Sequence, residues 1–385
     1  MRRSLRIAIL THSTNARGGV VHALELGEAL TQLGHTVVLH APDPAGGGFF
    51  RKVTVPTVSV AASPVAGSVA AMVETRVADY VRHFEDVASR SFDVFHAQDS
   101  ISGNALATLK QRGLIQCFAR TVHHMDAFDD ARLTELQRRA IAEADHIFTV
   151  SQVWADHVAE AFTCTPTVVG NGVDLSRFSA TPAPTDAGLR TRLGLGRGPV
   201  LLSIGGVEER KNTLTILDAF RQLRTIHPAA QLVIAGGASV LNHDSYQRRF
   251  KHRLFETGFP PGAVILAGVI PNIEMPSLYR LADALVFASL REGFGLVALE
   301  AMASGCPVIA SHIAPFTEYL NEDSVAWCNP LNPGSVANAM ATVLGAAMKE
   351  KLVANAAVAV RRHDWLRTAR VHVPVYDSMC EEIDA

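Results

Sequence analysis

The feature that most constrains the fold of this sequence is an alternation of short apolar runs with longer helical patterns. Each run is bounded by Gly, Asp, Asn or Pro, which is typical of strands buried on both faces of a parallel sheet. Helical patterns over residues 20–34 and 213–228 lie between such runs and end at Gly34 and Pro228. The alternation predicts doubly wound α/β architecture, with ligands at the carboxyl ends of the strands. The predicted strands are RIAIL, TVVLHA, DVFHA, HIFTVS, PVLLSIG, QLVIAGG, AVILAG, ALVFAS and PVIAS.

One stretch, residues 174–199, interrupts the alternation. It reads DLSRFSATPAPTDAGLRTRLGLGRGP, is rich in Pro, Gly, Ala and Thr, and lacks a long apolar run, so we interpret it as a linker. A chain of 385 residues that is 48% hydrophobic can bury two cores. We therefore expect one domain over residues 1–176, a second over 177–364, and a small-molecule site in a cleft between them.

The terminal segment, residues 365–385, has a pattern of its own. Trp365, Leu366, Val373 and Tyr376 have roughly helical spacing, but Pro374 is expected to kink or break the helix.

The overall charge and the cysteines exclude several classes of protein. With 35 Lys and Arg against 37 Asp and Glu, the formal net charge is −2, which argues against a nucleic-acid-binding protein. The five cysteines are scattered and form no CxxC pair, so we expect a reducing cytoplasm rather than a disulfide framework or a zinc site. The N-terminal apolar run is too short for a signal peptide, and no segment reaches the ~20 apolar residues of a membrane span.

The stretch LREGFGLVALEAMASGCPVIAS carries two acids, Glu292 and Glu300, around a glycine loop. ALVFAS predicts a strand before the loop, and LVALEAMASG predicts a helix after it. Backbone N–H groups near Gly293, Phe294 and Gly295 would face an anion or sugar hydroxyls, because the first turn of a helix leaves them unpaired. An isolated pair of glutamates is more often solvated. Glu300, however, lies in an apolar run and is expected to have a hydroxyl-bearing or cationic partner.

Two adjacent cations, Arg210 and Lys211, follow the predicted strand PVLLSIG. Near a strand's carboxyl end they are well placed to neutralise a diphosphate, although a solvated basic pair is an equally good interpretation from the sequence alone. No Asp-x-Asp pair stands near a strand end, so we expect that the protein uses no metal ion. Arg210 and Lys211 would supply the positive charge in its place.

The first predicted strand leads into THSTNARGGVVH, where Gly18 and Gly19 allow a close approach of the backbone to a ligand. This loop lacks the GxGxxG fingerprint of dinucleotide-binding proteins. Asp43, however, follows the second strand, where such proteins carry an acid that binds the ribose. Arg17 and His22 can be read as surface and helix-start residues, with a functional role for His22 as the alternative.

Two histidines, His123 and His124, end the predicted strand in FARTVHHMDAF. Only one of them can face the cleft, and their spacing does not support a metal. His96 and Asp99 are interpreted as loop-structuring groups. Asn171 and Gly172 are interpreted as a structural turn.

Together these residues resemble the retaining, two-domain glycosyltransferases of family 4, which have the GT-B fold. The strongest match is Glu292 through Glu300, the family's E-x7-E, followed by AMASGCPVIAS and the APFTEYL loop with Glu318. The supporting matches are GGVVHALELGEALTQLGHTV, TVHHMDAF, VSQ with VVGNGVDLSRF, and GGVEERKN, in the family's order.

The resemblance implies two Rossmann-like doubly wound domains that face a central cleft, and a terminal helix, residues 365–385, that crosses back to the N-terminal domain. It implies that Lys211 binds the donor diphosphate, Glu300 the nucleotide ribose and Glu292 the transferred sugar. The backbone of Gly293, Phe294, Gly295 and Leu296 would line that sugar. His123 matches the family's histidine near the reacting centre, and Gly19 its glycine loop.

One position departs from the family pattern. Many members have Arg directly after the glycine that ends the strand, where this chain has Gly206. We expect Arg210 to compensate, an inference from its position alone.

The resulting prediction is a cytoplasmic, retaining, metal-independent glycosyltransferase that uses a nucleotide-diphosphate sugar, with a UDP-sugar favoured, and an unidentified acceptor. The alternatives are a nucleotide-sugar epimerase and a non-catalytic sugar- or nucleotide-binding module, with a nicotinamide dehydrogenase disfavoured by the missing glycine fingerprint. The loops 43–56 and 123–133 are expected to shape the acceptor site. Phe49, Phe50, Arg51 and Lys52 offer a peripheral membrane contact, but we favour packing of this loop on its own domain.

Overall fold

The computed structural model of the chain describes residues 4–237 and 243–384 and divides into two compact units. The first unit contains residues 1–172 together with residues 365–385, and the second contains residues 173–364. The basic start of the chain, residues 1–3, and residue 385 lie outside the described residues.

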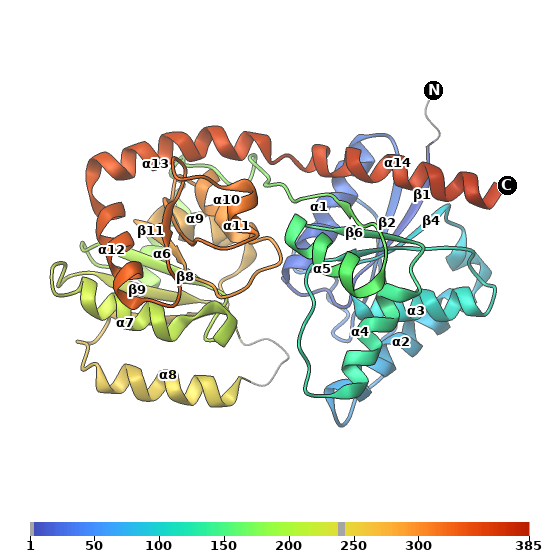
Figure 1. Ribbon diagram of the computed structural model, residues 1–385, viewed down its shortest axis with the longest axis horizontal. Coiled ribbons are helices and arrows are strands. Elements are labelled where there is room, and N and C mark those ends of the chain that lie inside the picture. Colours follow the sequence, from blue (N-terminus) through green and yellow to red (C-terminus); the bar gives the residue numbers. More distant parts are fainter. Residues whose placement is uncertain (1–3, 238–242, 385) are drawn as a thin grey trace. The chain divides into compact units, whose positions relative to one another are not determined.

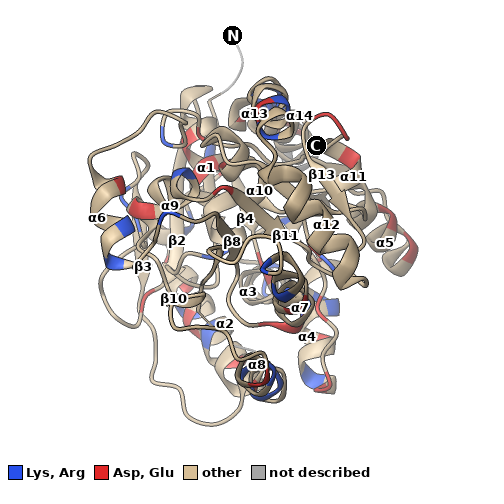
Figure 2. Ribbon diagram, turned by 90° about the vertical axis from the view of Figure 1, so that its left-hand side faces the viewer, with Lys and Arg blue, Asp and Glu red and all other residues tan. Residues whose placement is uncertain are grey.

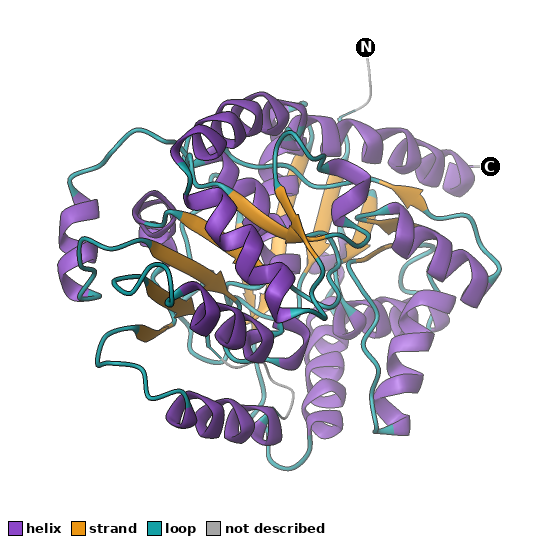
Figure 3. Ribbon diagram, turned by 60° about the vertical axis from the view of Figure 1, so that its left-hand side comes forward, coloured by secondary structure: helices purple, strands orange, loops and turns teal. Residues whose placement is uncertain are grey.

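A sheet of seven parallel strands forms the centre of the first unit, in the order β3-β2-β1-β4-β5-β6-β7. Figure 1 labels β1, β2, β4 and β6 of this sheet, and Figure 3 shows the strands in orange. Chain order reverses between β1 and β4, which makes the sheet doubly wound. The strands are β1 (Arg6–Leu10), β2 (Thr36–Pro42), β3 (Thr57–Val60), β4 (Val94–Ala97), β5 (Ala119–Val122), β6 (His146–Thr149) and β7 (Thr167–Val168).

Helices cover this sheet, and their buried side chains complete its core. Tyr80 and Phe84 of α2 and Leu106 of α3 pack against Leu10 and Phe95 of the strands. The long terminal helix α14 lies along α1 (Figure 1). The helices of this unit are α1 (Gly18–Gln32), α2 (Val69–Glu85), η1 (Val87–Arg90), α3 (Ser100–Gln111), α4 (Ala131–Ala142), α5 (Gln152–Phe162) and α14 (Trp365–Asp384).

The second unit has a sheet of six parallel strands in the order β10-β9-β8-β11-β12-β13, which reverses between β8 and β11. The strands are β8 (Val200–Ile204), β9 (Gln231–Ala235), β10 (Val264–Gly268), β11 (Ala284–Phe287), β12 (Val308–Ser311) and β13 (Ala326–Cys328).

Helices α7 and α12 bury Phe220, Leu223 and Met340 against Leu201 and Ile309 of this second sheet. The helices of this unit are α6 (Thr185–Arg192), η2 (Glu209–Lys211), α7 (Thr213–Leu223), α8 (Asp244–Glu256), η3 (Asn272–Glu274), α9 (Met275–Leu281), α10 (Leu296–Ala303), α11 (Phe316–Tyr319), α12 (Pro333–Leu344), α13 (Ala346–Ala359) and η4 (Val360–Arg362).

The predicted strands are confirmed, and the doubly wound fold with them. All nine apolar runs, and the run that ends at His123, contain a strand of one of the two sheets. The apolar pattern did not predict β3, β7 and β13, because these short strands lie at sheet edges, where side chains need not be apolar on both faces.

The structure differs from the sequence interpretation in two details. The stretch 174–199, interpreted as a linker, contains α6, whose Leu189 is buried and whose Asp186 pairs with Arg280 of α9. Pro374 does not break the terminal helix, which continues to Asp384. Val373 and Tyr376 beside it are buried, and that burial offsets the hydrogen bond that proline removes.

Charges of both signs are interspersed over the helices, as α6, α7 and α8 show in Figure 2. Among the helices of the described residues, none combines the length and the apolar character that crossing a bilayer requires.

His40 of β2 is an unusual member of the first core. Its side chain is buried among Phe84, Phe92 and His83, and in the described part of the chain neither of its ring nitrogens has a hydrogen-bond partner. Burial, and to a smaller extent His83, lower the pKa of His40 to about 3. The folded protein therefore holds this imidazole neutral.

We expect His40→Leu to flatten the loss of stability in mild acid. Below pH 6.5 the unfolded chain takes up a proton at His40 that the folded chain does not, so the free energy of unfolding falls as the pH falls from 6.5 towards 3. At pH 5 the cost is about 2 kcal/mol, which the leucine variant should recover. Urea unfolding at pH 8 and pH 5 measures this, with His252→Gln of the exposed α8 surface as the control. An unchanged difference between the two pH values would show that His40 does not carry it.

Candidate functional site

Polar side chains collect in each unit where the strand order reverses. In the second unit, the loops after β8 and β11 carry Arg210, Lys211 and Glu292. In the first unit, the loops after β1 and β4 carry His12 and Gln98. Loops on the two sides of a reversal diverge and leave a crevice, so ligands of doubly wound sheets bind there.

The two loops of the second unit are joined by one backbone hydrogen bond and by one side chain. The backbone N–H of Leu290 donates to the carbonyl of Arg210 at 2.9 Å. The side-chain amide of Asn212 donates to the carbonyls of Ala288 at 3.0 Å and Pro330 at 2.7 Å, and the backbone of Asn212 is left-handed, with φ 59°. Asn212 is buried, and its contacts fix the residues just before it against the end of β11.

Glu292 lies between the two cations that the sequence analysis singled out. Its Oε1 is 2.7 Å from Nζ of Lys211, and its Oε2 is 2.7 Å from an Nη of Arg210. Burial acts to raise the pKa of Glu292, but Lys211 and Arg210 outweigh it and lower this pKa, so the carboxylate is ionised. Burial lowers the pKa of Lys211, which Glu292 partly counteracts. A carboxylate with both oxygens held by cations has a fixed orientation.

A second acid, Glu208, borders this group and was not singled out from the sequence. It is buried, with one carboxylate oxygen 4.0 Å from Arg210 and the other 3.7 Å from His243. Glu208, Glu209 and Arg210 are three consecutive charged residues. The sequence alone therefore does not indicate which of the two glutamates is buried.

The glycines after β8 and β9 lie close together at residue 206, where the chain departs from the family pattern. A Cβ on Gly206 would lie 3.0 Å from the carbonyl of Gly237, and one on Gly236 would lie 2.7 Å from the N of Gly206. The ends of β8 and β9 thus touch backbone to backbone, which leaves Gly206, with φ 74°, no room for a side chain. Arg210 provides a guanidinium beside Glu292 instead.

The glycine loop before α10 is held by aromatic rings. Gly295 has φ 99°, and a Cβ there would lie 2.7 Å from Phe316 and 2.8 Å from Phe287. Phe294 stacks on Tyr319 at 4.3 Å, and the Tyr319 hydroxyl donates to its carbonyl at 2.8 Å. The packing fixes the backbone at the start of α10, where Leu296 begins the helix and Gly293 directly follows Glu292.

Glu300 lies one turn further along α10 and has the hydroxyl-bearing partner that its apolar surroundings predicted. The hydroxyl of Tyr279 on α9 is 2.6 Å from its Oε2. Burial raises the pKa of Glu300, while the Tyr279 hydrogen bond and the charge of Arg177 oppose this. The sequence did not point to Tyr279.

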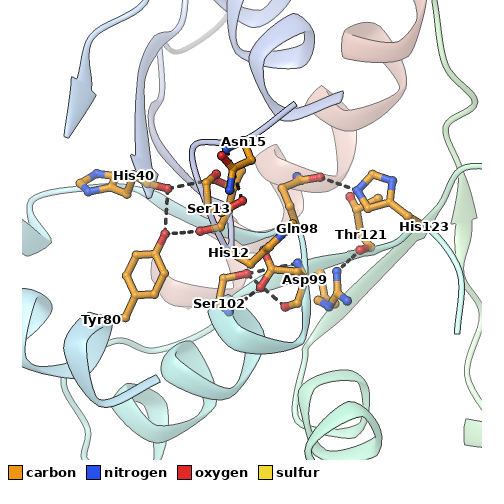
Figure 4. A network of polar contacts seen from close by, with 12 residues as sticks. His12, Ser13, Asn15, His40, Tyr80, Gln98, Asp99, Ser102, Thr121 and His123 are labelled. Carbon is orange, nitrogen blue, oxygen red and sulfur yellow. Dashed lines mark hydrogen bonds and ion pairs between the residues drawn. The ribbon is translucent and has the colours of Figure 1, made fainter. Parts of the chain in front are cut away.

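In the first unit, His123 lies against the glycine loop and the polar group after β4 (Figure 4). Its Nε2 is 3.1 Å from Oε1 of Gln98, and a Cβ on Gly19 would lie 3.1 Å from its ring. Burial, and then the charges of His22 and Arg120, lower the pKa of His123 well below the usual value, so the ring is neutral. His124, in contrast, is exposed and faces Asp126, so the two adjacent histidines do point in different directions.

His22 is not a surface residue, in contrast to one of its two interpretations. It is fully buried inside α1, its Nδ1 is 2.7 Å from Oδ1 of Asn171, and its ring centroid is 4.9 Å from that of His123. The tight turn expected at Asn171 and Gly172 is wrong, because the chain makes its turn at residues 175–177, and Asn171 instead contacts His22.

Asp99 structures its loop as expected, because it caps α3 through the N–H of Ser102. His96 does not, because it lies inside β4 and contacts Thr121 of β5 and Tyr376 of α14.

The loop after β2 packs on its own unit, as favoured from the sequence. Arg51 pairs with Glu25 and Glu28 of α1 at 2.7 and 3.4 Å. Asp43 accepts hydrogen bonds from Gly48 and Ser59, so it holds this loop.

Within residues 4–237 and 243–384, no three His, Cys, Asp or Glu side chains are arranged so that they could hold a metal ion.

Solved structures share the fold of this chain. Sucrose-phosphate synthase from Thermosynechococcus elongatus matches with a TM-score of 0.80 and 23% identity, over 98% of this chain and 99% of that one. HepE of Anabaena, in complex with UDP and glucose, matches with a TM-score of 0.78 and 18% identity, over 97% of this chain and 100% of that one. The two doubly wound units therefore form a GT-B fold.

Family comparisons narrow this class. The model described as Glycosyl transferases group 1 matches residues 190–358, and that described as Glycosyltransferase Family 4 matches residues 16–177. Since the two matches together cover most of the chain, the chain belongs to the group 1 glycosyltransferase family.

Curated relatives agree with this assignment. A D-inositol 3-phosphate glycosyltransferase of Salinispora arenicola is 32% identical over 253 residues, which are 59% of this chain and 55% of the relative. Glycogen synthase of Mycobacterium tuberculosis is 31% identical over 242 residues, which are 61% and 55%. The chain spans a little over half the length of these two relatives.

We expect Gly205→Ala to weaken nucleotide binding by displacing Lys211. A Cβ at this position, where φ is 120°, would lie 2.4 Å from Cε of Lys211. Displacing a charged donor should cost about tenfold in affinity for a nucleoside diphosphate, measured by calorimetry. Gly258→Ala is the matched control, because Gly258 also has positive φ, at 60°, but has open space around it. Equal affinities in the two variants would contradict a binding role for Lys211.

Proposed function

We propose that the protein is a retaining, metal-independent glycosyltransferase that moves a sugar from a nucleotide diphosphate, preferably UDP, to an acceptor hydroxyl. The observation that carries the proposal is the group of Arg210, Lys211 and the buried Glu292 at the reversal of the second sheet. Two cations there would bind the diphosphate, while the carboxylate between them would accept hydrogen bonds from the hydroxyls of the sugar.

The cations have donors to share between Glu292 and a diphosphate. Lysine carries three N–H donors and arginine five, and Glu292 accepts one contact from each within 2.7 Å. The first N–H groups of α10, from Leu296 onward, add the positive end of a helix beside Glu292. These groups support a site for a ligand that carries both phosphate and sugar.

The remaining roles come from the resemblance and are consistent with the local geometry. Glu300 would bind the ribose, and the backbone from Gly293 to Leu296 would line the sugar. His123 and Gly19, which touch in the first unit, would contribute near the reacting carbon. Because His123 is neutral, it would offer hydrogen bonds to a substrate and not a positive charge.

A UDP-sugar donor is supported by a structural neighbour, since HepE of Anabaena has been solved with UDP and glucose and, separately, with UDP-glucose.

In the proposed reaction the bond between the anomeric carbon and the diphosphate breaks, and the acceptor oxygen bonds to the same face of the sugar. Arg210 and Lys211 would stabilise the charge that grows on the leaving diphosphate, an electrostatic contribution that needs no covalent intermediate. The leaving phosphate would take the acceptor's proton, with Glu292 as a positioning group. The protein's contribution is thus to fix charges and hydroxyls in advance.

We expect Lys211→Ala to weaken binding of the preferred nucleotide at least tenfold, because it removes a charged phosphate donor. Calorimetric titration of UDP, GDP and ADP into both proteins measures this and identifies the base. Lys351→Ala is the matched control, since Lys351 lies in the same unit and pairs with Asp323 at an exposed position. Equal binding by wild type and Lys211→Ala would remove the diphosphate role of Lys211.

We expect Glu292→Gln to slow sugar transfer about 10²-fold while nucleotide affinity changes little, because the amide keeps the shape but loses the charged acceptor. Release of nucleoside diphosphate from UDP-, GDP- and ADP-glucose, with water as the acceptor, provides the assay. Near-normal release by Glu292→Gln would contradict the sugar-positioning role.

The same assay on the wild type tests the finer parts of the proposal. Proton NMR should show the anomer of the donor in the first sugar released, and EDTA should leave the rate unchanged. Inversion at the anomeric carbon, or a rate lost with EDTA and restored by Mg²⁺ or Mn²⁺, would correct the mechanism and leave the donor site in place. An epimerised sugar nucleotide would indicate an epimerase instead.

A further inference from the structure

Tyr279 is buried in the second unit with a single functional contact. The residue is 0% exposed on α9, and its hydroxyl donates to Oε2 of Glu300 at 2.6 Å. Burial and the charge of Glu300 raise the pKa of Tyr279 well above its usual value, so the phenol keeps its proton and acts as a donor.

Only one of the two oxygens of Glu300 is held. Among residues 4–237 and 243–384, Tyr279 is the hydrogen-bond partner found for Glu300, and it bonds Oε2. Oε1 is not among the buried unpaired atoms, and the residue is half-buried. The carboxylate therefore has one anchored oxygen and one oxygen that a ligand can reach.

The helix that carries Tyr279 is itself anchored. The next residue, Arg280, forms two hydrogen bonds with Asp186 of α6, at 2.7 and 2.9 Å, and these hold the pKa of Asp186 at about 2. Phe178 contacts the Tyr279 ring edge-on, with centroids 6.0 Å apart. The phenol hydroxyl is consequently at a fixed point from which it can set the rotamer of Glu300.

We propose that Tyr279 is a positioning residue for the donor nucleotide: it holds Glu300 in the orientation in which the free carboxylate oxygen accepts hydrogen bonds from the ribose hydroxyls. This inference rests on the proposed function, which assigns the ribose to Glu300. A free glutamate side chain loses rotamer entropy when a ligand immobilises it, and the tyrosine removes that cost beforehand. The bond also favours the ionised carboxylate, which accepts hydroxyl protons at both oxygens.

A merely structural tyrosine is the competing explanation, and the ribose hydroxyls distinguish the two. The affinities of UDP and 2′,3′-dideoxy-UDP are measured for wild type and Tyr279→Phe, together with the corresponding GDP and ADP pairs. The phenylalanine removes one oxygen atom and adds none, and thermal denaturation checks its fold. We expect UDP to bind about tenfold more weakly to Tyr279→Phe and the dideoxy analogue to bind unchanged within about twofold.

Two further variants complete the test. Glu300→Gln should lower the preference for UDP over dideoxy-UDP, and adding Tyr279→Phe to it should cause little further loss, because both changes act on one contact. Tyr246→Phe is the matched control. This tyrosine of α8 is also buried and bonds the N–H of Leu214, so its loss should leave the preference for the ribose unchanged.

The pH dependence supplies a readout that does not depend on absolute affinity. Removing the Tyr279 hydroxyl should raise the pKa of Glu300 further, because a hydrogen bond that favours the ionised form is lost. Binding of UDP to Tyr279→Phe should therefore decline at a higher pH than binding to wild type as the solution is acidified.

The outcomes separate the two proposals. Equal weakening of UDP and dideoxy-UDP in Tyr279→Phe would overturn the positioning role and leave the proposed function intact. A wild type that binds UDP without preference over dideoxy-UDP would overturn the ribose role of Glu300 and this inference with it.

A wild type that binds none of UDP, GDP and ADP would overturn the donor site as a whole. Should Tyr279→Phe fail to fold, the preference and pH profile of Glu300→Gln decide, since unchanged values in that variant would overturn the inference.

Discussion

A buried carboxylate that is held by two cations is the interaction on which the second unit is organised. An ionised Glu292 away from water would be strongly unfavourable without oppositely charged neighbours. Lys211 and Arg210 come from a different strand end, so the loops after β8 and β11 have to meet. The side-chain amide of Asn212 joins these loops by donating to the carbonyl of Ala288, and the residue has a left-handed backbone conformation. The same cations that stabilise Glu292 are the groups proposed to bind a diphosphate.

The sheets that carry these loops were predictable because their strands are buried on both faces. A buried parallel strand must be apolar at nearly every position, and runs such as ALVFAS show this in the sequence. The edge strand Thr57–Val60 has a mixed pattern, since one side of it faces solvent, and it was missed. Leu189 and Asp186 give α6 its contacts, but a stretch rich in Pro and Gly concealed the helix.

The candidate site was predictable by residue type and by strand end, but not by contact. Arg210, Lys211 and Glu292 each follow a predicted strand, yet the sequence does not state that these strands are neighbours across the reversal of the sheet. Glu300 was expected to need a partner because charge is costly in an apolar run, and Tyr279 satisfies that need. The identity of the partner depends on how α9 and α10 pack, a contact between helices that no local pattern encodes.

The contact between the two glycine turns has a consequence for how this protein and its relatives can diverge. Gly206 and Gly236 share one space, so a larger residue at either position needs a rearrangement at the other, and the two positions have to change together. A family arginine at 206 is therefore not one substitution away from this chain. In this chain the guanidinium beside Glu292 comes from further along the loop, at residue 210. The placement of that charge therefore depends on the backbone of two turns and not on the side chain at residue 206 alone.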